Sequence, residues 1–197
     1  MKKSYGLFWQ LLFIILTFLG CEYSQVPYDL IIQNGTVVDG TNTPAFKASL
    51  AIKKDKIVKI SKENIKSSLA IKTIDAKGLI VSPGFIDMHT NVEVNIQEYP
   101  LAENFIHQGV TTLMASLHSG DQAFPLDTYA DSLIMAPNVG YFAGHSWIRK
   151  QVMGLKNKVP SKEELQKMKY YVEETMKQGA LGLSSGLEYV PGNYANE

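Results

Sequence analysis

Hydrophobic and polar residues alternate in short runs between residues 28 and 82. The runs are "DLIIQ", "TVVDG", "ASLAIK", "KIVKI", "IKTIDA" and "LIVSP", and their length and alternation are typical of β-strands. The pair Asn34-Gly35 separates the first two runs, and Asn-Gly between apolar runs predicts a tight hairpin turn. We therefore predict six short strands that form a small β-sandwich-like domain, or a half-barrel, over residues 28–82.

The pattern changes after Pro83-Gly84, where apolar strands alternate with segments of helical periodicity. The predicted strands are "GFIDMH", "VTTLMASLH", "NVGYFAGH" and "ALGLSSG". The predicted helices between them are "PLAENFIHQG", "LDTYADSLI" and "SKEELQKMKYYVEETMKQG". Strands that alternate with helices favour a parallel sheet, because each helix returns the chain to the edge where the previous strand began.

The clearest helix signals lie in residues 161–179. Ser161 and Glu164 have the spacing of a capping box, and Gly179 has the position of a residue that ends a helix. One apolar face recurs at helical spacing, formed by Leu165, Met168, Val172 and Met176. This segment therefore predicts an amphipathic helix that packs against the sheet.

Three of the four histidines close predicted strands. His89, His118 and His145 are separated by 29 and 27 residues, which is about the length of one strand–helix unit. Because the carboxyl ends of parallel strands meet at one edge, this spacing predicts three imidazoles around a common site. The alternative is that strand-end histidines only hydrogen-bond neighbouring loops. His107 falls within a predicted helix and is expected to be a surface or packing residue.

The charge balance limits the classes of partner. The chain has 19 basic and 19 acidic side chains, so its formal net charge is zero. Binding to nucleic acid or to an anionic membrane surface depends on an excess of basic residues. The sequence therefore argues against nucleic acid as a partner. The hydrophobic content of 45% is ordinary for a globular protein with a buried core.

The first residues have the organisation of an export signal. Two lysines precede an apolar run from Leu7 to Leu19, which is short for a membrane span and typical of a signal-peptide core. The run ends in "FLGC", which resembles a bacterial lipoprotein box whose cysteine is lipid-modified. We therefore predict a lipoprotein-type signal peptide over residues 1–20, lipidation of Cys21 and a tether over residues 21–27. An ordinary secretory signal or a short anchor is the alternative.

Several longer motifs resemble one family. "DLIIQNGTVVDGTNTPAF", "GLIVSPGFIDMHT", "QGVTT", "GHSWIRKQVMG" and "GALGLSSGLEYVPGNYA" resemble the D-aminoacylase (N-acyl-D-amino-acid deacylase) branch of the amidohydrolase superfamily. The resemblance implies an α/β fold in which a small β domain precedes a TIM-like barrel. It also implies a zinc-dependent hydrolase that cleaves the amide of N-acyl-D-amino acids.

The resemblance also suggests metal ligands, with two departures from the family pattern. His89 corresponds to the first histidine of the family's His-x-His pair, whereas Asn91 stands at the second position and is a poor ligand for transition metals. His118 stands where the family has a bridging cysteine, and a neutral imidazole offers one lone pair rather than a bridge. Both departures favour a site with one zinc ion.

Arg149 in "GHSWIRKQVMG" and Tyr189 in "SSGLEYVPG" match family positions that are expected to face the substrate, and His145 at the end of its strand is expected to line the pocket. The alternatives are a rim ion pair for Arg149 and a half-buried aromatic for Tyr189. A guanidinium can hold a carboxylate bidentately, and a phenol can add a hydrogen bond. The serines at 184 and 185 could suggest a nucleophile, but strand-end serines commonly satisfy loop amides and the family gives them no such role.

The resemblance covers only part of a barrel. Residues 83–197 hold about four strand–helix units, whereas a complete barrel takes about 250 residues. We therefore expect the N-terminal half of a longer enzyme, with the general-base aspartate and further zinc ligands beyond Glu197. The alternatives are a cyclic amidohydrolase of the dihydroorotase or hydantoinase type and a noncatalytic lipoprotein that binds ligands in its pocket. In each case we expect an exported protein that a lipid on Cys21 anchors in a bacterial cell envelope, on its periplasmic or outer face.

Overall fold

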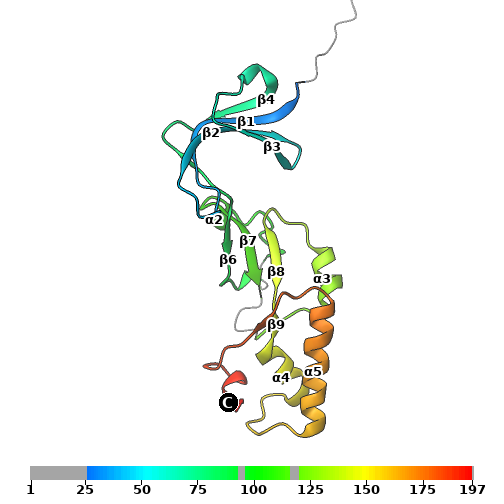
Figure 1. The fold of residues 1–197 in the computed structure, drawn as a ribbon. Helices are drawn as coiled ribbons and strands as arrows, with labels where there is room; N and C mark the ends of the chain where they lie inside the picture. Colours follow the sequence, from blue (N-terminus) through cyan, green and yellow to red (C-terminus); the bar gives the residue numbers. More distant parts are fainter. Residues whose placement is uncertain (1–25, 93–95, 116–119, 197) are drawn as a thin grey trace, which may run out of the picture. The chain divides into compact units, whose positions relative to one another are not determined.

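A computed structural model describes residues 26–92, 96–115 and 120–196. The chain divides into two compact units, one up to Pro83 and one from Gly84, and each is described by itself (Figure 1). The predicted signal peptide, Cys21 and the first part of the tether lie outside the described residues. Within those residues, no helix has the length and apolar character that a membrane crossing requires.

The first unit is one five-stranded sheet. Its strand order is β3-β2-β1-β4, and β5 also pairs with β1. Strand β2 is antiparallel to β1 and β3, whereas β4 and β5 run parallel to β1. The strands are β1 (Tyr28–Val37), β2 (Phe46–Lys53), β3 (Lys56–Ser61), β4 (Ala70–Asp75) and β5 (Ile80–Val81), and a short 3-10 helix, η1 (Ser67–Leu69), precedes β4.

The predicted hairpin at Asn34-Gly35 is wrong, because β1 continues through both residues. Asn34 has a φ of 61°, and the pairing of β1 with β2 shifts register between Ile32 and Gly35. These features define a β-bulge rather than a turn. Glycine is required there because a Cβ on Gly35 would lie 2.6 Å from Cγ2 of Val81. The bulge lets one strand pair with β4 along its first half and with β5 along its end.

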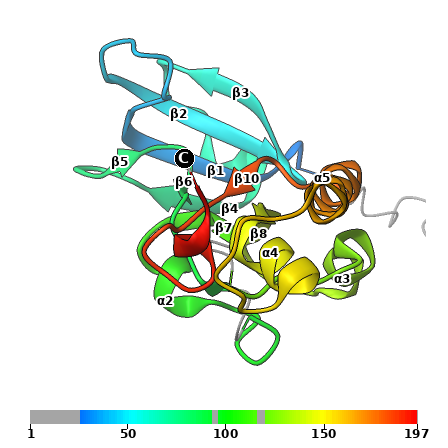
Figure 2. The same ribbon diagram turned by 90° about the horizontal axis from the view of Figure 1, so that it is seen from below.

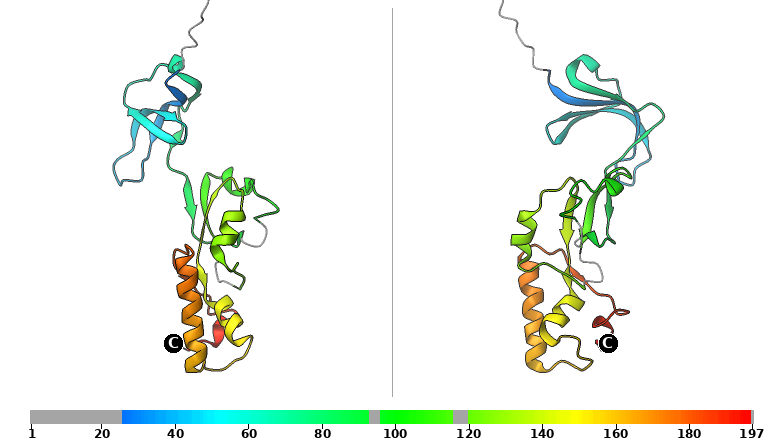
Figure 3. Two further views of the ribbon diagram at one scale, coloured as in Figure 1. Left: turned by 90° about the vertical axis from the view of Figure 1, so that its right-hand side faces the viewer. Right: turned by 180° about the vertical axis from the view of Figure 1, so that it is seen from behind.

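The sheet of the first unit buries two small clusters instead of forming the predicted sandwich. All five strands belong to one hydrogen-bonded layer, which Figure 3 shows from two sides. The buried residues of one cluster are Ile31, Ala51 and Ile65, and those of the other are Val37, Ala48 and Leu50. The six predicted strands reduce to five because the first two are one strand.

The second unit is built on parallel strands, as the alternation of strands and helices predicted. One sheet has the order β6-β7-β8 (Figure 2). A second sheet pairs β9 with β10, and every pairing in the two sheets is parallel. The strands are β6 (Phe85–Asp87), β7 (Val110–Ala115), β8 (Asn138–Tyr141), β9 (Ala143–Gly144) and β10 (Leu183–Ser184). The helices are α2 (Glu103–Ile106), α3 (Leu126–Ser132), α4 (His145–Met153) and α5 (Lys162–Lys177), followed by the 3-10 helix η3 (Gly192–Tyr194).

Helix α5 begins and ends where its sequence signals predict. Oγ of Ser161 accepts from the backbone N–H of Glu164 at 3.2 Å, and Oε2 of Glu164 accepts from the backbone N–H of Ser161 at 2.8 Å. Gly179 follows the helix with a φ of 103°, a conformation that glycine adopts without strain. On the predicted apolar face, Met168 and Val172 pack against the core, whereas Leu165 and Met176 are each 42% exposed.

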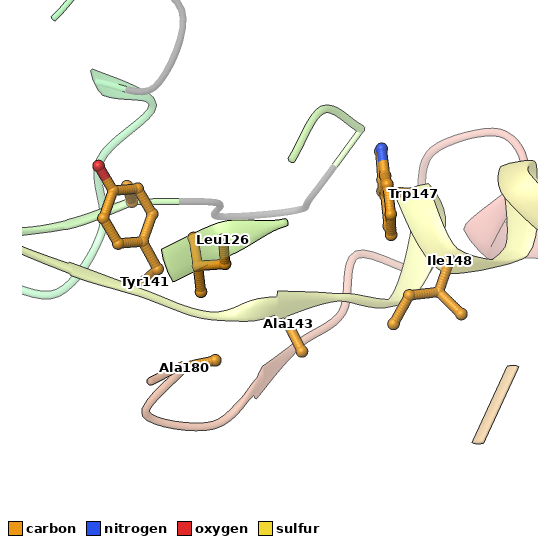
Figure 4. Packing of buried hydrophobic residues seen from close by; sticks show 7 residues of the cluster. Leu126, Tyr141, Ala143, Trp147, Ile148 and Ala180 are labelled. Atoms are coloured by element: carbon orange, nitrogen blue, oxygen red, sulfur yellow. The ribbon is translucent and has the colours of Figure 1, made fainter. Parts of the chain in front are cut away.

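The main core of the second unit lies where α4 and α5 meet the strands. Its buried members are Ala115, Leu126, Tyr141, Ala143, Trp147, Ile148 and Ala180 (Figure 4). Phe124, Trp147 and Tyr171 add ring contacts, with centroids 5.4–5.6 Å apart. Ala143 and Trp147 lie on either side of the junction between β9 and α4. The packed core therefore fixes the turn that carries His145.

Candidate functional site

The candidate site lies at the carboxyl ends of β9 and β10. Strand β9 pairs in parallel with β10, so that Ser184 is opposite Gly144. The next residue in each segment carries a polar side chain: His145 begins α4, and Ser185 follows β10. Nδ1 of His145 lies 2.9 Å from Oγ of Ser185, within hydrogen-bond distance. The parallel pairing therefore brings together two polar groups that are 40 residues apart.

The surroundings of His145 disfavour a charged imidazole. Burial of the ring lowers its pKa below the ordinary value, and the positive charge of Arg149 lowers the pKa further. Both effects act in the same direction, so the ring is neutral at neutral pH. A neutral imidazole at the end of a strand can exchange hydrogen bonds with a substrate without adding charge.

Arg149 occupies a buried position rather than the exposed position that a substrate ligand would need. Its side chain is 2% exposed, and its Nη2 donates to the backbone carbonyl of Lys158 at 2.8 Å. This hydrogen bond joins α4 to the loop before α5. The geometry favours a structural role, and the predicted contact with a substrate carboxylate stays a prediction.

Tyr189 lies between β10 and η3. Its side chain is 53% exposed, and its backbone carbonyl accepts from the N–H of Asn193 at 2.9 Å. The nearby Gly192 packs tightly, since a Cβ there would lie 2.4 Å from the carbonyl oxygen of Gly186 and 2.7 Å from Oγ of Ser146. The segment from 186 to 194 is thus held against α4. The predicted role of the phenol in substrate binding stays a prediction.

His89 and Asn91 do not share a strand face, because β6 ends at Asp87. Oδ1 of Asp87 accepts from the backbone N–H of His89 at 3.0 Å and shapes the bend after the strand. The buried hydroxyl of Thr90 donates to the carbonyl of Met114 at 2.6 Å and ties the following loop to β7. The alternation that would aim both side chains at one cation therefore does not apply.

Asn91 instead lines a pocket of about 420 Å³ in the second unit. The other lining residues are mostly apolar: Val92, Ile96, Tyr99, Ala102, Asn104 and Phe105. Ala102 has a φ of 45°, a left-handed conformation that is strained for a residue with a Cβ. Nothing in the sequence indicated that Asn91 would line a pocket.

The described residues alone do not complete a zinc site. No group of three or more His, Cys, Asp or Glu side chains within them is placed to hold a metal ion. His118 lies in the segment 116–119, outside the described residues. The imidazole of His89 suits zinc, but structural and catalytic zinc sites have three or four protein ligands. His89 and His118 could therefore supply only some of the ligands of such a site.

Gln122 is a buried polar residue that sequence reasoning missed. Its Oε1 accepts from the backbone N–H of Gly144 at 2.6 Å, and its Nε2 donates to Oγ1 of Thr175 at 3.2 Å. The side chain thus links the residue before His145 to helix α5. A single glutamine in "GDQAF" carries no periodic or motif signal, and the structure was needed to find it.

Comparisons with known proteins place similar chains among the amidohydrolases. No protein-family model matches the chain. D-aminoacylase of Alcaligenes xylosoxydans xylosoxydans is 33% identical over 190 residues, which cover 84% of this chain and 39% of that protein. N-acyl-D-glutamate deacylase of the same organism is 29% identical over 197 residues, covering 88% of this chain and 40% of that protein. The chain thus spans about two fifths of the length of the curated relatives it matches.

Solved structures give the same picture. A D-aminoacylase with a binuclear metal centre, described by one-metal activation and second-metal attenuation, has a TM-score of 0.74 and 30% identity and covers 86% of this chain and 41% of its own. N-acyl-D-glutamate deacylase from Bordetella bronchiseptica, complexed with zinc and a phosphonate inhibitor, has a TM-score of 0.70 and 27% identity. It covers 86% of this chain and 40% of its own. The α/β fold of this chain is similar to these amidohydrolase structures.

Proposed function

Since the chain is homologous to the D-aminoacylase branch of the amidohydrolases, we propose that it is part of a metal-dependent N-acyl-D-amino-acid deacylase. The 33% identity to D-aminoacylase over 84% of this chain is the observation that carries the proposal. The reaction is hydrolysis of a non-peptide amide, which gives a carboxylate and a free D-amino acid. The proposal concerns an enzyme of the relatives' length, to which residues 1–197 contribute.

The proposed substrate site is the edge where the parallel strands end. His145 offers a neutral imidazole there, which can hydrogen-bond the amide or the acyl group of the substrate. The half-exposed phenol of Tyr189 lies four residues beyond Ser185 and can add a second hydrogen bond. Arg149 joins α4 to the loop before α5 and lowers the pKa of His145, so its proposed contribution is to keep that ring uncharged.

We propose one zinc ion, with His89 and His118 among its ligands. Bound zinc would polarise the acyl carbonyl and lower the pKa of a bound water molecule from 15.7 to about 7. Asn91 lines an apolar pocket, which favours its exclusion from the ligand set. The similar D-aminoacylase has a binuclear metal centre for which one-metal activation is described, so one ion is compatible with activity in that protein. The remaining ligands and the general-base aspartate would come from sequence outside residues 1–197.

The proposal is tested on the complete protein that contains this chain. Zinc content is measured by mass spectrometry, and hydrolysis of N-acetyl-D-amino acids is compared with that of the N-acetyl-L forms. We expect about one zinc per chain and turnover of the D forms only. His89→Ala should lower the zinc content and abolish turnover, whereas His107→Ala, at an exposed histidine, should leave both unchanged.

The same assay separates the alternatives. Turnover of hydantoins or dihydropyrimidines without turnover of N-acetyl-D-amino acids would identify a cyclic amidohydrolase. Tight binding of N-acyl amino acids with no turnover and no zinc would identify a noncatalytic binding protein. The segment "ALGLSSG", which contains β10, lacks the lysine that bridges two metals in other amidohydrolases. For this reason we favour the deacylase over a cyclic amidohydrolase.

We also propose that the protein is exported and anchored to a bacterial envelope through a lipid on Cys21. The basis is the sequence alone: an apolar run of signal-peptide length ends in "FLGC", and Cys21 is the one cysteine in the chain. Labelling with a radioactive fatty acid should mark the wild-type protein and not Cys21→Ser. Equal labelling of both proteins, or of neither, would contradict the lipid anchor.

A further inference from the structure

The hydrogen bond between His145 and Ser185 joins two segments that are already fixed by their backbones. The N–H of Ala143 donates to the carbonyl of Gly182 at 2.8 Å, and the N–H of Leu181 donates to the carbonyl of Tyr141 at 2.8 Å. Beside them, the N–H of Gly144 donates to the buried Gln122. The Cα positions of the two residues are therefore set by the strands, and only their side-chain torsions remain to be chosen.

A contact at Nδ1 decides which way the imidazole faces. The two ring nitrogens lie on different sides of the ring, and each can make one hydrogen bond. With Nδ1 at 2.9 Å from Oγ of Ser185, Nε2 is the ring nitrogen that remains for another partner. Rotation of the ring by half a turn would exchange this arrangement for a carbon facing the hydroxyl and would lose the hydrogen bond.

We propose that Ser185 is a positioning residue that orients the imidazole of His145, so that Nε2 is the atom that meets the substrate. This inference rests on the proposed function, because it assigns the substrate to the edge where β9 and β10 end. Ser185 itself does not touch the reacting atoms. It acts through His145 by removing the alternative orientation of the ring.

A serine beside a histidine could instead form a nucleophile and its base, and Arg149 argues against that. In a serine–histidine–aspartate triad, the carboxylate stabilises the imidazolium that forms when the histidine takes the serine proton. Lys169 and Glu173 line the same pocket as His145, but the charge that shifts its pKa is the guanidinium of Arg149, which has the opposite sign to a carboxylate and disfavours the imidazolium. The pair is therefore suited to orientation rather than to proton abstraction from Ser185.

The inference is tested by Ser185→Ala, Ser185→Thr and, as a matched control, Ser132→Ala. Ser132 is an exposed serine of the same unit whose hydroxyl donates to the carbonyl of Tyr129 at 2.7 Å, in helix α3. The first measurement, on the complete protein, is the ¹⁵N resonance of Nδ1 of His145, which is assigned as the signal that His145→Gln removes. Ser185→Ala should shift this resonance, Ser185→Thr should restore it, and Ser132→Ala should leave it unchanged.

The second measurement is steady-state hydrolysis of an N-acetyl-D-amino acid by the complete protein. We expect Ser185→Ala to raise KM about fivefold, the factor that corresponds to one neutral hydrogen bond, with kcat within about twofold of wild type. Ser185→Thr should restore KM. An unchanged Nδ1 resonance in Ser185→Ala would overturn the inference. So would a loss of kcat accompanied by an acyl group on Ser185, which would identify a nucleophile.

The two measurements also separate this inference from the proposed function. A shifted Nδ1 resonance in a protein without any deacylase turnover would support the positioning contact and defeat the deacylase proposal. Normal deacylase turnover with an unshifted resonance in Ser185→Ala would support the deacylase proposal and defeat the positioning contact. Thermal unfolding of each variant checks that the fold is retained, which is expected because the side chain of Ser185 is exposed.

Discussion

Burial and the guanidinium of Arg149 both lower the pKa of His145 in the folded chain, which links this residue to stability. The unfolded chain keeps the ordinary value of 6.5 and so takes up a proton at higher pH than the folded chain. The stability that depends on a neutral His145 is therefore fully present above pH 6.5 and declines as the pH falls through 6.5 towards the lower folded value.

The first prediction concerns this pH dependence. We expect the urea concentration at the unfolding midpoint of the wild-type chain to decrease when the pH is lowered from about 7.5 to about 5. His145→Gln should show a smaller decrease, because it removes the titrating ring. The measurement is equilibrium urea unfolding at a series of pH values, followed by circular dichroism. The same decrease of the urea midpoint with pH in both proteins would show that His145 does not contribute to the pH dependence of stability.

A second prediction at this scale concerns the tight contact at Gly192. A Cβ there would lie 2.4 Å from the carbonyl oxygen of Gly186, a backbone atom that cannot move aside cheaply. We expect Gly192→Ala to lower the free energy of unfolding by about 2 kcal/mol through overpacking. Gly182→Ala is the matched control, because its Cβ would meet Phe142 at an ordinary 3.5 Å. Equal effects of both substitutions on urea unfolding would refute the contact argument.

Individual site residues were predictable only where a pattern carried them. The spacing of His89 and His145 indicated strand ends, and the structure places both just after a strand. The burial of Arg149 had no such signal, because α4 buries four consecutive residues rather than one face at helical spacing. The same holds for Gln122, whose partners lie on β9 and α5 and become neighbours only in the folded chain.

At the scale of elements, local signals were sufficient for α5 and misleading for β1. The capping box of α5 is formed by residues within four positions of one another, so the local sequence is sufficient to predict it. The pair Asn34-Gly35 is compatible with a turn or with a bulge, and the choice depends on distant strands. Strand β5 and Val81 occupy the place beside Gly35, and this parallel pairing keeps β1 extended. Nothing within residues 28–37 indicates that pairing.

The third prediction belongs to helix α5. Ser161→Ala removes the hydroxyl that accepts from the N–H of Glu164, and it should lower the free energy of unfolding by about 1 kcal/mol. Gln166→Ala, at an exposed position within the same helix, should have little effect because alanine is a good helix former. Urea unfolding of both variants is the measurement. An effect of Gln166→Ala as large as that of Ser161→Ala would mean that the cap is not responsible.

At the scale of the whole molecule, the buried clusters follow the division into two units. The clusters around Ile31 and Val37 involve described residues of the first unit only. Those around Leu126 and Leu113 involve described residues of the second unit only. The sequence anticipated a change of pattern at Pro83-Gly84, since strands alone precede that point and strands alternate with helices after it. The sequence did not indicate which residues of each unit are fully buried, because that depends on packing between residues that are distant in the chain.

The fourth prediction follows from these separate cores. Ile31 is 0% exposed and Leu126 is 1% exposed, so replacing either by alanine leaves a cavity and should destabilise its own unit by about 2–5 kcal/mol. Hydrogen exchange of backbone amides, read by mass spectrometry, reports each unit separately. We expect Ile31→Ala to speed exchange in β1, β2 and β4 and Leu126→Ala to speed it in β7, β8 and α5. The exposed Ile134→Ala is the control and should change neither, because that side chain is 91% exposed.

Equal acceleration across both units in each core variant would show that the chain opens as a single cooperative block. Separate acceleration would mean that residues 84–196 hold His145 and Ser185 in place through their own core.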